Sequence, residues 1–309
     1  MSNDLRRVIT AAVGIPIALG IVWYGGLALA LLVIVAAVLG TRELFDLAEH
    51  AGTRPLRGLG MTLAALAPFT TWLLASEQPG GAGFTVFGAP VGGGILGLLG
   101  RIPLWLFSQW PLAAALTPPL ILACVLWKRR PEQHPLGAAA VTLFGPLYCG
   151  VLPSALLVIR YAAGPDRSWA ATWLVFFPFV VTWLCDSFAM WGGKLIGGPK
   201  LAPVVSPGKT RAGAVAGVVG GVLTALLYVP LALAPFGRAF SLGAAAAMGL
   251  VLAVTAQVGD LAESLLKREA GVKDSGGLIP GHGGVLDRLD SLYFVLPVAA
   301  LLFRAFGVV

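Results

Sequence analysis

The sequence has few charged residues. Only 11% of its 309 residues are Asp, Glu, Lys or Arg, while 58% are hydrophobic; an ordinary soluble domain carries about 25% charged residues. This shortage argues against a soluble enzyme and predicts a membrane protein. The net charge of +7 is interpreted as the excess of Lys and Arg that marks cytoplasmic loops, not as a nucleic-acid-binding surface.

Cysteine is also scarce. The three residues Cys124, Cys149 and Cys185 lie in apolar surroundings and have no CxxC spacing. This pattern indicates neither a disulfide framework nor a zinc site. We therefore expect all three to be packing residues.

Long apolar runs are abundant instead. About 20 apolar residues are needed to cross the hydrocarbon core, and such runs predict an all-α polytopic bundle of about nine spans. The Gly-rich stretch 77–102 can form a loop, a re-entrant segment or an extra span. The predicted spans lie near residues 8–24, 26–41, 59–76, 103–127, 136–160, 169–190, 213–234, 241–259 and 291–308.

The Lys- and Arg-rich segments are spaced two spans apart. Five such segments can therefore lie on one side of the membrane, which the positive-inside rule assigns to the cytoplasm. The C-terminus is then expected outside. These segments are the N-terminus, the loop with Arg42, Arg54 and Arg57, the loop 128–130, the loop 194–211 and residues 260–290.

Two groups of charged residues stand apart from a nearly neutral chain, one at 186–211 and a denser one at 260–290. Ionisable residues near membrane depth are costly, which makes such a cluster a candidate functional site. The alternative is a solvated loop that only sets topology. Such a loop has no need of five carboxylates beside its cations, so the mixture of signs favours a site.

The spacing within the second group predicts a metal site. Asp260, Glu263 and Lys267 share one face of a helix, and Asp287 and Asp290 share another. Carboxylates from two helix ends form the hard oxygen cage that Mg²⁺ prefers. The alternative for Asp287 and Asp290 is an ion pair with Arg288 within their own helix.

A glycine-rich segment, 276–284, lies between these carboxylates and includes His282. Glycines let backbone N–H groups approach an anion closely, and Lys267, Arg268, Lys273 and Arg288 can neutralise a triphosphate. We expect nucleotide or pyrophosphate binding here. Upstream, Gly208-Lys209-Thr210 lacks the earlier glycine of a P-loop, but Lys209 beside a helix N-terminus can still hold a phosphate.

Together these motifs resemble the phosphatidate cytidylyltransferase family. The resemblance is carried by residues 264–268, 273–276, 282–284 and 287–290, and further by 186–197, 201–203 and 206–210; it covers about residues 183–295. Arg211, Ala212 and Gly198-Pro199 depart from the usual pattern. They affect the expected role of the loop after Lys209 and none of the carboxylates.

The resemblance implies an inner-membrane enzyme of bacteria that uses CTP and phosphatidic acid, with its active site facing the cytoplasm. It implies Mg²⁺, with a second cation such as K⁺, and a homodimer. Residues 1–182 would form a membrane scaffold and 183–309 the catalytic region. The implied site comprises Asp260, Asp287 and Asp290 as catalytic metal ligands, Lys209 as their basic partner, and Lys267, Arg268, Lys273, His282, Arg288, Ser206 and Asp186 as CTP or phosphate contacts.

Two other functions fit parts of the pattern. A CTP-dependent polyprenol or lipid kinase-like transferase would share the architecture and differ in its acceptor lipid. An ion-coupled transporter would also place carboxylates and glycine-broken helices near the membrane. Consumption of CTP with release of pyrophosphate distinguishes the transporter from both enzymes.

Overall fold

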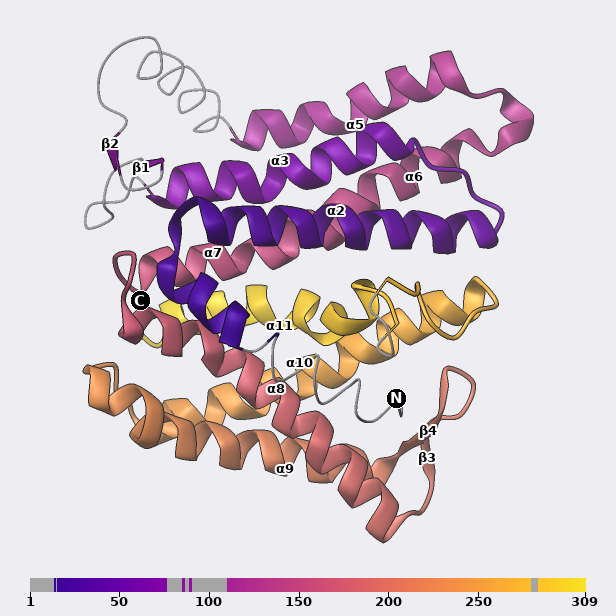
Figure 1. Ribbon diagram of the computed structural model, residues 1–309. Helices are drawn as coiled ribbons and strands as arrows, with labels where there is room; N and C mark the ends of the chain where they lie inside the picture. The colour runs from indigo at the N-terminus through magenta and orange to yellow at the C-terminus, as the bar shows by residue number, and fades with distance from the viewer. Residues whose placement is uncertain (1–13, 15, 77–84, 87–88, 91–109, 279–282) are drawn as a thin grey trace, which may run out of the picture.

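The computed structural model describes residues 14, 16–76, 85–86, 89–90, 110–278 and 283–309 (Figure 1). Helices dominate these residues, and the strands among them form two short two-stranded sheets. The all-α prediction is therefore confirmed for the described part of the chain.

The first part of the chain is a set of apolar helices and one small hairpin. Residues 16–24 are helical. The elements that follow are α2 (Gly26–His50), α3 (Arg57–Ser76), β1 (Thr85–Val86), β2 (Ala89–Pro90), α5 (Trp110–Lys128), η1 (Pro131–Gln133), α6 (Pro135–Gly145), the π-helical turn η2 (Pro146–Val151) and α7 (Leu152–Ala162).

The second part of the chain contains four long helices and an antiparallel hairpin that pairs Lys200 with Thr210 and Ala202 with Ser206. Its elements are α8 (Trp169–Ile196), β3 (Lys200–Ala202), β4 (Ser206–Thr210), α9 (Arg211–Tyr228), η3 (Val229–Leu233), η4 (Ala234–Phe236), α10 (Leu242–Glu269) and α11 (Leu286–Ala305).

Six helices among the described residues are long and apolar enough to cross a membrane. The number of nine spans stays a prediction, because part of the expected span 8–24 and most of the stretch 77–102 lie outside the described residues. The six helices cover Gly26–His50, Arg57–Ala75, Pro135–Ala162, Trp169–Ile196, Arg211–Phe236 and Leu242–Glu269.

Hydroxyl side chains fix the starts of three helices in the second part of the chain. Ser168, Thr210 and Ser241 precede α8, α9 and α10, and each accepts a hydrogen bond from the backbone N–H three residues later, at 3.2, 3.0 and 3.1 Å. Such caps satisfy N–H groups that have no partner within the helix. The start of each of these helices is thus determined by its local sequence.

The helices run roughly alongside one another, and several of their connections lie at one end of the bundle. In Figure 1 the α2–α3 connection, the α5–α6 connection, the β3–β4 hairpin and the α10–α11 connection are all at the right-hand end. These connections carry four of the five cationic segments, as the spacing predicted. The fifth, at the N-terminus, lies outside the described residues, and the orientation in a membrane stays a prediction.

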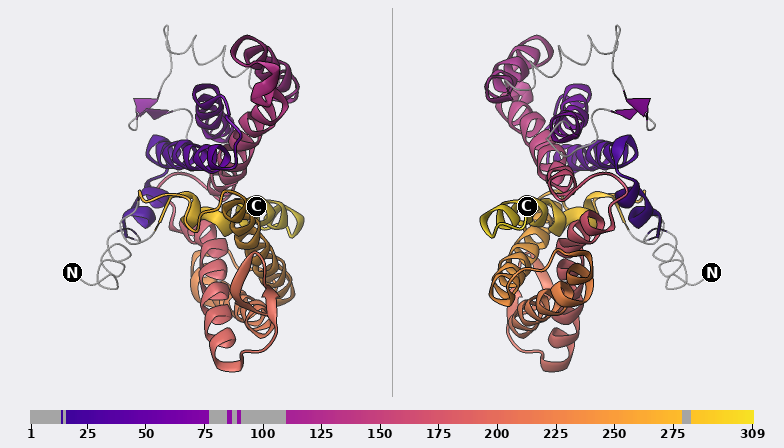
Figure 2. Two further views of the ribbon diagram at one scale, coloured as in Figure 1. Left: turned by 90° about the vertical axis from the view of Figure 1, so that its right-hand side faces the viewer. Right: turned by 90° about the vertical axis from the view of Figure 1, so that its left-hand side faces the viewer.

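Helix α11 lies between two groups of helices. Viewed along the bundle, α8, α9 and α10 lie on one side of it and α2, α3 and α5 on the other (Figure 2). The main core, with fully buried Leu157, Phe177, Met248 and Phe303, joins the groups. A smaller core next to it packs Leu44 of α2 and Tyr148 of η2 against the ends of α10 and α11. Its buried residues are Leu44, Leu47, Tyr148, Cys149, Ala270, Leu286 and Tyr293.

The cysteines behave as packing residues. Cys149 and Cys185 are buried, Cys124 is partly buried, and all three are free thiols. The prediction that they form no disulfide is confirmed.

Candidate active site

A cavity of about 600 Å³ lies between α8, the β3–β4 hairpin, α9 and α10. Small-molecule sites typically measure about 300–1,000 Å³, so this cavity can hold a nucleotide or a lipid headgroup. We call it the main pocket. Its lining combines two carboxylates with three lysines, and the residues that line it are Asp186, Ala189, Met190, Gly193, Lys194, Gly197, Gly198, Lys200, Leu201, Gly208, Lys209, Thr210, Gly213, Ala214, Gln257 and Asp260.

Glycines bring two walls of the main pocket close together. A Cβ at Gly213 of α9 would lie 2.6 Å from the backbone oxygen of Ala189 on α8, and one at Gly217 would lie 3.0 Å from that of Cys185. Contacts shorter than about 3 Å require the backbone to move, so larger residues would push α9 away from α8. Asp186 of α8 and Lys209 of β4, which leads into α9, face one pocket because these helices pack so closely.

Lys209 and Asp260 form an ion pair across the main pocket. The Nζ of Lys209 lies 2.6 Å from Oδ2 of Asp260, and the two side chains are 29% and 28% exposed. Lys209 belongs to β4, and its neighbour Thr210 caps α9. The predicted partnership of Lys209 with the carboxylate centre is therefore present in the geometry.

Three carboxylates, Asp186 of α8, Asp260 of α10 and Asp290 of α11, lie near enough to interact electrostatically beside this ion pair. The charges of Asp260 and Asp290 act on Asp186, and the charge of Asp260 acts on Asp290. Helix α11 can approach α10 closely at this point, because a Cβ at Gly259 would lie 3.0 Å from the backbone oxygen of Asp290. The sequence had assigned Asp186 to phosphate contacts; its position places it electrostatically with the carboxylates.

Asp287 lies in a different network. Its Oδ1 accepts a hydrogen bond from Nζ of Lys267 at 2.7 Å, and its Oδ2 accepts from the backbone N–H groups of Ser275 and Gly284, each at 2.9 Å. Lys267 also contacts the fully buried Glu263 at 3.1 Å. Asp287 thus has its ion pair with Lys267 of α10, and none of the described ion pairs joins it to Arg288.

A buried carboxylate that the sequence analysis missed completes this network. Glu43 of α2 is 6% exposed and accepts hydrogen bonds from Ser275 Oγ and from the backbone N–H groups of Val285 and Leu286. Nothing within 200 residues of Glu43 in the sequence belongs to this network. A single sequence offers no signal for such a pairing.

The other described residues predicted to contact phosphate are not among those that line the main pocket. Arg268 donates hydrogen bonds to the backbone oxygens of Val205 and Val272, so its guanidinium links the β3–β4 hairpin to the end of α10. Lys273 and Arg288 are exposed, and Ser206 is partly buried at the start of β4. His282 lies outside the described residues.

The carboxylates fit a divalent cation by chemistry, without forming a ready-made ligand shell. Among the described residues, no three His, Cys, Asp or Glu side chains are gathered closely enough to hold a metal ion. Asp260 is paired with Lys209, and Asp287 with Lys267. Asp260, Asp287 and Asp290 nevertheless carry the hard oxygen donors that Mg²⁺ prefers, and with Asp287 engaged by Lys267 the predicted ligand set stays a prediction.

This arrangement predicts an effect of Asp186 on magnesium dependence. If Asp186 takes part in holding the cation, Asp186→Asn should raise the Mg²⁺ concentration for half-maximal activity by about 10-fold or more. The measurement is a magnesium titration of activity for the purified variant and for wild type, both in mixed micelles of the same composition. An unchanged or lowered requirement would show that Asp186 only adds repulsion and is no part of the metal site.

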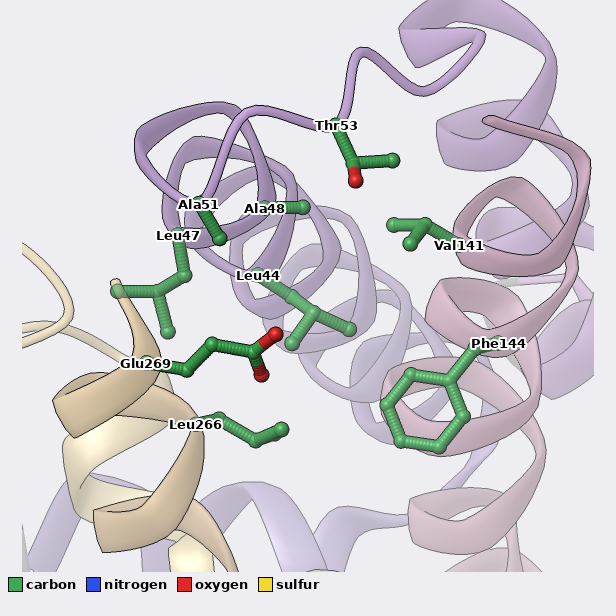
Figure 3. Close-up of a pocket in the computed structure, with 9 residues that line it drawn as sticks. All are labelled: Leu44, Leu47, Ala48, Ala51, Thr53, Val141, Phe144, Leu266 and Glu269. Atoms are coloured by element: carbon green, nitrogen blue, oxygen red, sulfur yellow. The ribbon is translucent and has the colours of Figure 1, made fainter. Parts of the chain in front are cut away.

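A second cavity is too small for a substrate. It measures about 110 Å³ and lies between α2, α6 and α10 (Figure 3). Leu44, Leu266 and Phe144 surround it with apolar surface, and the carboxylate of Glu269 points into it. The main pocket is therefore the better candidate for nucleotide chemistry.

Comparison with known proteins agrees with this geometry. A model of the "Cytidylyltransferase family" matches residues 5–306. The phosphatidate cytidylyltransferase of Brucella abortus is 34% identical over 309 residues, which cover 100% of this chain and 95% of that protein. The phosphatidate cytidylyltransferase of Haemophilus influenzae is 35% identical over 195 residues (62% of this chain, 64% of that protein), and that of Staphylococcus aureus is 45% identical over 130 residues (41% and 48%).

The Brucella match extends over the helices before residue 183 as well as over the segments with the motifs. The family match likewise includes both parts of the chain, with the main pocket and the Glu43 network inside it. The chain belongs to the cytidylyltransferase family.

Proposed function

We propose that the chain transfers CMP from CTP to phosphatidic acid, which gives CDP-diacylglycerol and pyrophosphate for phospholipid biosynthesis. The observation that carries the proposal is the main pocket, where Lys194, Lys200 and Lys209 lie beside Asp186 and Asp260 at one end of a bundle of apolar helices. The names of the full-length relatives supply the substrate class.

The pocket has the charge that the reaction requires. A phosphate oxygen of phosphatidic acid attacks the α-phosphorus of CTP, the bond from that phosphorus to the bridging oxygen breaks, and pyrophosphate leaves. Both reactants are anions, so their repulsion is the main obstacle. Lys194, Lys200 and Lys209 can neutralise the phosphates and orient them for in-line displacement.

No general base is needed, because the attacking phosphate oxygen is already ionised near neutral pH. We assign Asp260, Asp287 and Asp290 to hold Mg²⁺, with a second cation such as K⁺ in the same group. When bound, Mg²⁺ supplies Lewis-acid stabilisation of the charge on the phosphate oxygens. Lys209 then screens Asp260 from the incoming anions.

The surface beside the main pocket fits a lipid acceptor. On α8, Trp191, Leu195 and Ile196 are exposed by 59%, 80% and 71%, next to Lys194 in the pocket lining. In a bilayer such side chains face hydrocarbon. The acyl chains can therefore stay in the membrane while the phosphate reaches the lysines.

The proposal includes a bacterial inner-membrane location with the main pocket facing the cytoplasm, and a homodimer. The cationic connections at the same end of the bundle support the cytoplasmic side. Bacterial relatives support the bacterial membrane.

Purified wild-type protein in mixed micelles should form CDP-diacylglycerol from CTP and phosphatidic acid, and should release pyrophosphate in equal amount. Radiolabelled CTP with thin-layer separation of the lipids, together with a coupled pyrophosphate assay, measures both. A polyprenol acceptor in parallel tests the kinase-like alternative. Product from polyprenol alone would refute the phosphatidate assignment, and folded protein that consumes no CTP would favour a transporter.

A further inference from the structure

The buried carboxylate of Glu43 connects α2 to the segment between α10 and α11. It receives the Ser275 hydroxyl at 3.1 Å and the backbone N–H groups of Val285 and Leu286 at 3.0 and 2.8 Å. Burying a carboxylate is costly unless several hydrogen bonds compensate for its lost hydration. Two of these donors are at the start of α11, where the helix dipole also favours a negative charge.

Two glycines of the Gly-rich segment make room for this carboxylate. A Cβ at Gly276 would lie 2.9 Å from Glu43 Oε1, and a Cβ at Gly284 would lie 2.3 Å from Oε2. From the sequence, these glycines are expected to let a phosphate approach the backbone. The geometry shows that at both positions the anion that needs the space is a side chain of the protein.

Glu43 and Asp287 hold the same residue. Ser275 Oγ lies 3.1 Å from Glu43 Oε2 and 2.9 Å from Asp287 Oδ2. The hydroxyl has a single proton, which it can donate to only one of these oxygens at a time. The backbone N–H of Ser275 is donated to Asp287. The position of Asp287 is therefore linked, through Ser275 and through the first turn of α11, to the position of Glu43.

From this geometry we propose that Glu43 is a positioning residue for the reaction, acting through Ser275 and the N-terminus of α11 to hold Asp287 against Lys267 and to set the position of Asp290 on the same helix. The inference rests on the proposed function for its kinetic effect. Its structural consequence, that Glu43 holds the chain around Ser275 in place, can be measured without any substrate.

The first test compares Glu43→Gln with Glu49→Gln. Glu49 is on the same helix, but it is 40% exposed and pairs with Arg57 at 3.1 Å. Glu43→Gln should lower kcat by about 10- to 100-fold, the range typical of residues that orient a ligand from outside. Its KM for CTP should stay within about twofold, and Glu49→Gln should match wild type in both constants.

The second test uses trypsin on protein in detergent without substrate or metal. Lys273 is exposed beside Ser275, and Lys128 is exposed in a connection that does not contact Glu43. Glu43→Gln should increase cleavage after Lys273 by about tenfold while leaving cleavage after Lys128 unchanged, because only the segment held by Glu43 loosens. Peptide mass analysis over a time course gives both rates.

A further variant reaches the same contact without changing α2. Gly284→Ala places a methyl group against Glu43 Oε2 and should reproduce both effects, so the proposal stays testable if Glu43→Gln does not fold. Unchanged cleavage after Lys273 in the folded variants would overturn the positioning role. So would activity lost only in proportion to the folded fraction. Inactive wild type with the expected cleavage pattern would refute the proposed function alone.

Discussion

Asp260→Asn should lower kcat by at least about a thousandfold, which corresponds to about 4 kcal/mol of lost transition-state stabilisation. Asp260 lies at the centre of the charged groups, because it pairs with Lys209 at 2.6 Å and acts electrostatically on both Asp186 and Asp290. The amide keeps the shape of the side chain and removes its charge. Initial rates of CDP-diacylglycerol formation at saturating CTP measure the effect.

Two controls separate this loss from a simple broken ion pair. Glu269→Gln removes a carboxylate from the same helix in the small cavity and should stay within about twofold of wild type. The double variant Asp260→Asn with Lys209→Met removes both members of the pair. If Asp260 acted only through Lys209, the double variant would be as active as Lys209→Met alone; we expect it to be markedly less active than Lys209→Met.

Arg160→Met should destabilise the protein by about 3–5 kcal/mol. Arg160 of α7 is fully buried, and its guanidinium donates to the backbone oxygens of Val22, Gly164 and Pro165 at 2.8, 3.0 and 2.9 Å, with Asp166 3.8 Å away. Methionine fills part of the space and supplies no donor. The backbone oxygens of Val22, Gly164 and Pro165 would then lose this donor.

Thermal unfolding followed by fluorescence-detected size exclusion should show a melting temperature about 10 °C lower than that of wild type. Arg167→Met is the matched control, because Arg167 is exposed and only stacks over Tyr24, at 5.3 Å; it should change the melting temperature by no more than about 3 °C. Equal shifts in both variants would contradict a special role for Arg160. At low temperature Arg160→Met should keep its activity, since α7 ends at the left of the bundle in Figure 1, at the opposite end from the β3–β4 hairpin.

Much of the site was predictable because it depends on local spacing. The stripe of Asp260, Glu263 and Lys267 follows from helical periodicity, and the structure places Lys267 against Glu263 at 3.1 Å. Hydropathy gave the positions of the helices for a similar reason, since each apolar run is continuous in the sequence. The structure extends several of them beyond the predicted spans, for example α10 to Glu269 and α2 to His50, because helical hydrogen bonding continues past the apolar stretch.

The contacts that depend on the packing of distant helices were not predictable. The pairing of Asp287 with Lys267 and of Glu43 with Ser275 requires knowledge of which helix ends meet. Lys194 and Lys200 belong to the charged group 186–211, but no role could be given to either before the β3–β4 hairpin placed them on a cavity wall. The division at residue 182 stays a prediction, although Glu43 bonds across it.

The bond from Leu286 to Glu43 joins residues that are 243 positions apart. A ribosome therefore makes the carboxylate long before it makes the helix end that this carboxylate caps. While the chain is being inserted into the membrane, α2 carries an unsatisfied acid, and the carboxylates of α11 do not yet exist. The reaction centre can form only after α11 has been made and has packed against α2 and α10. An incomplete chain therefore has no catalytic activity and consumes no CTP.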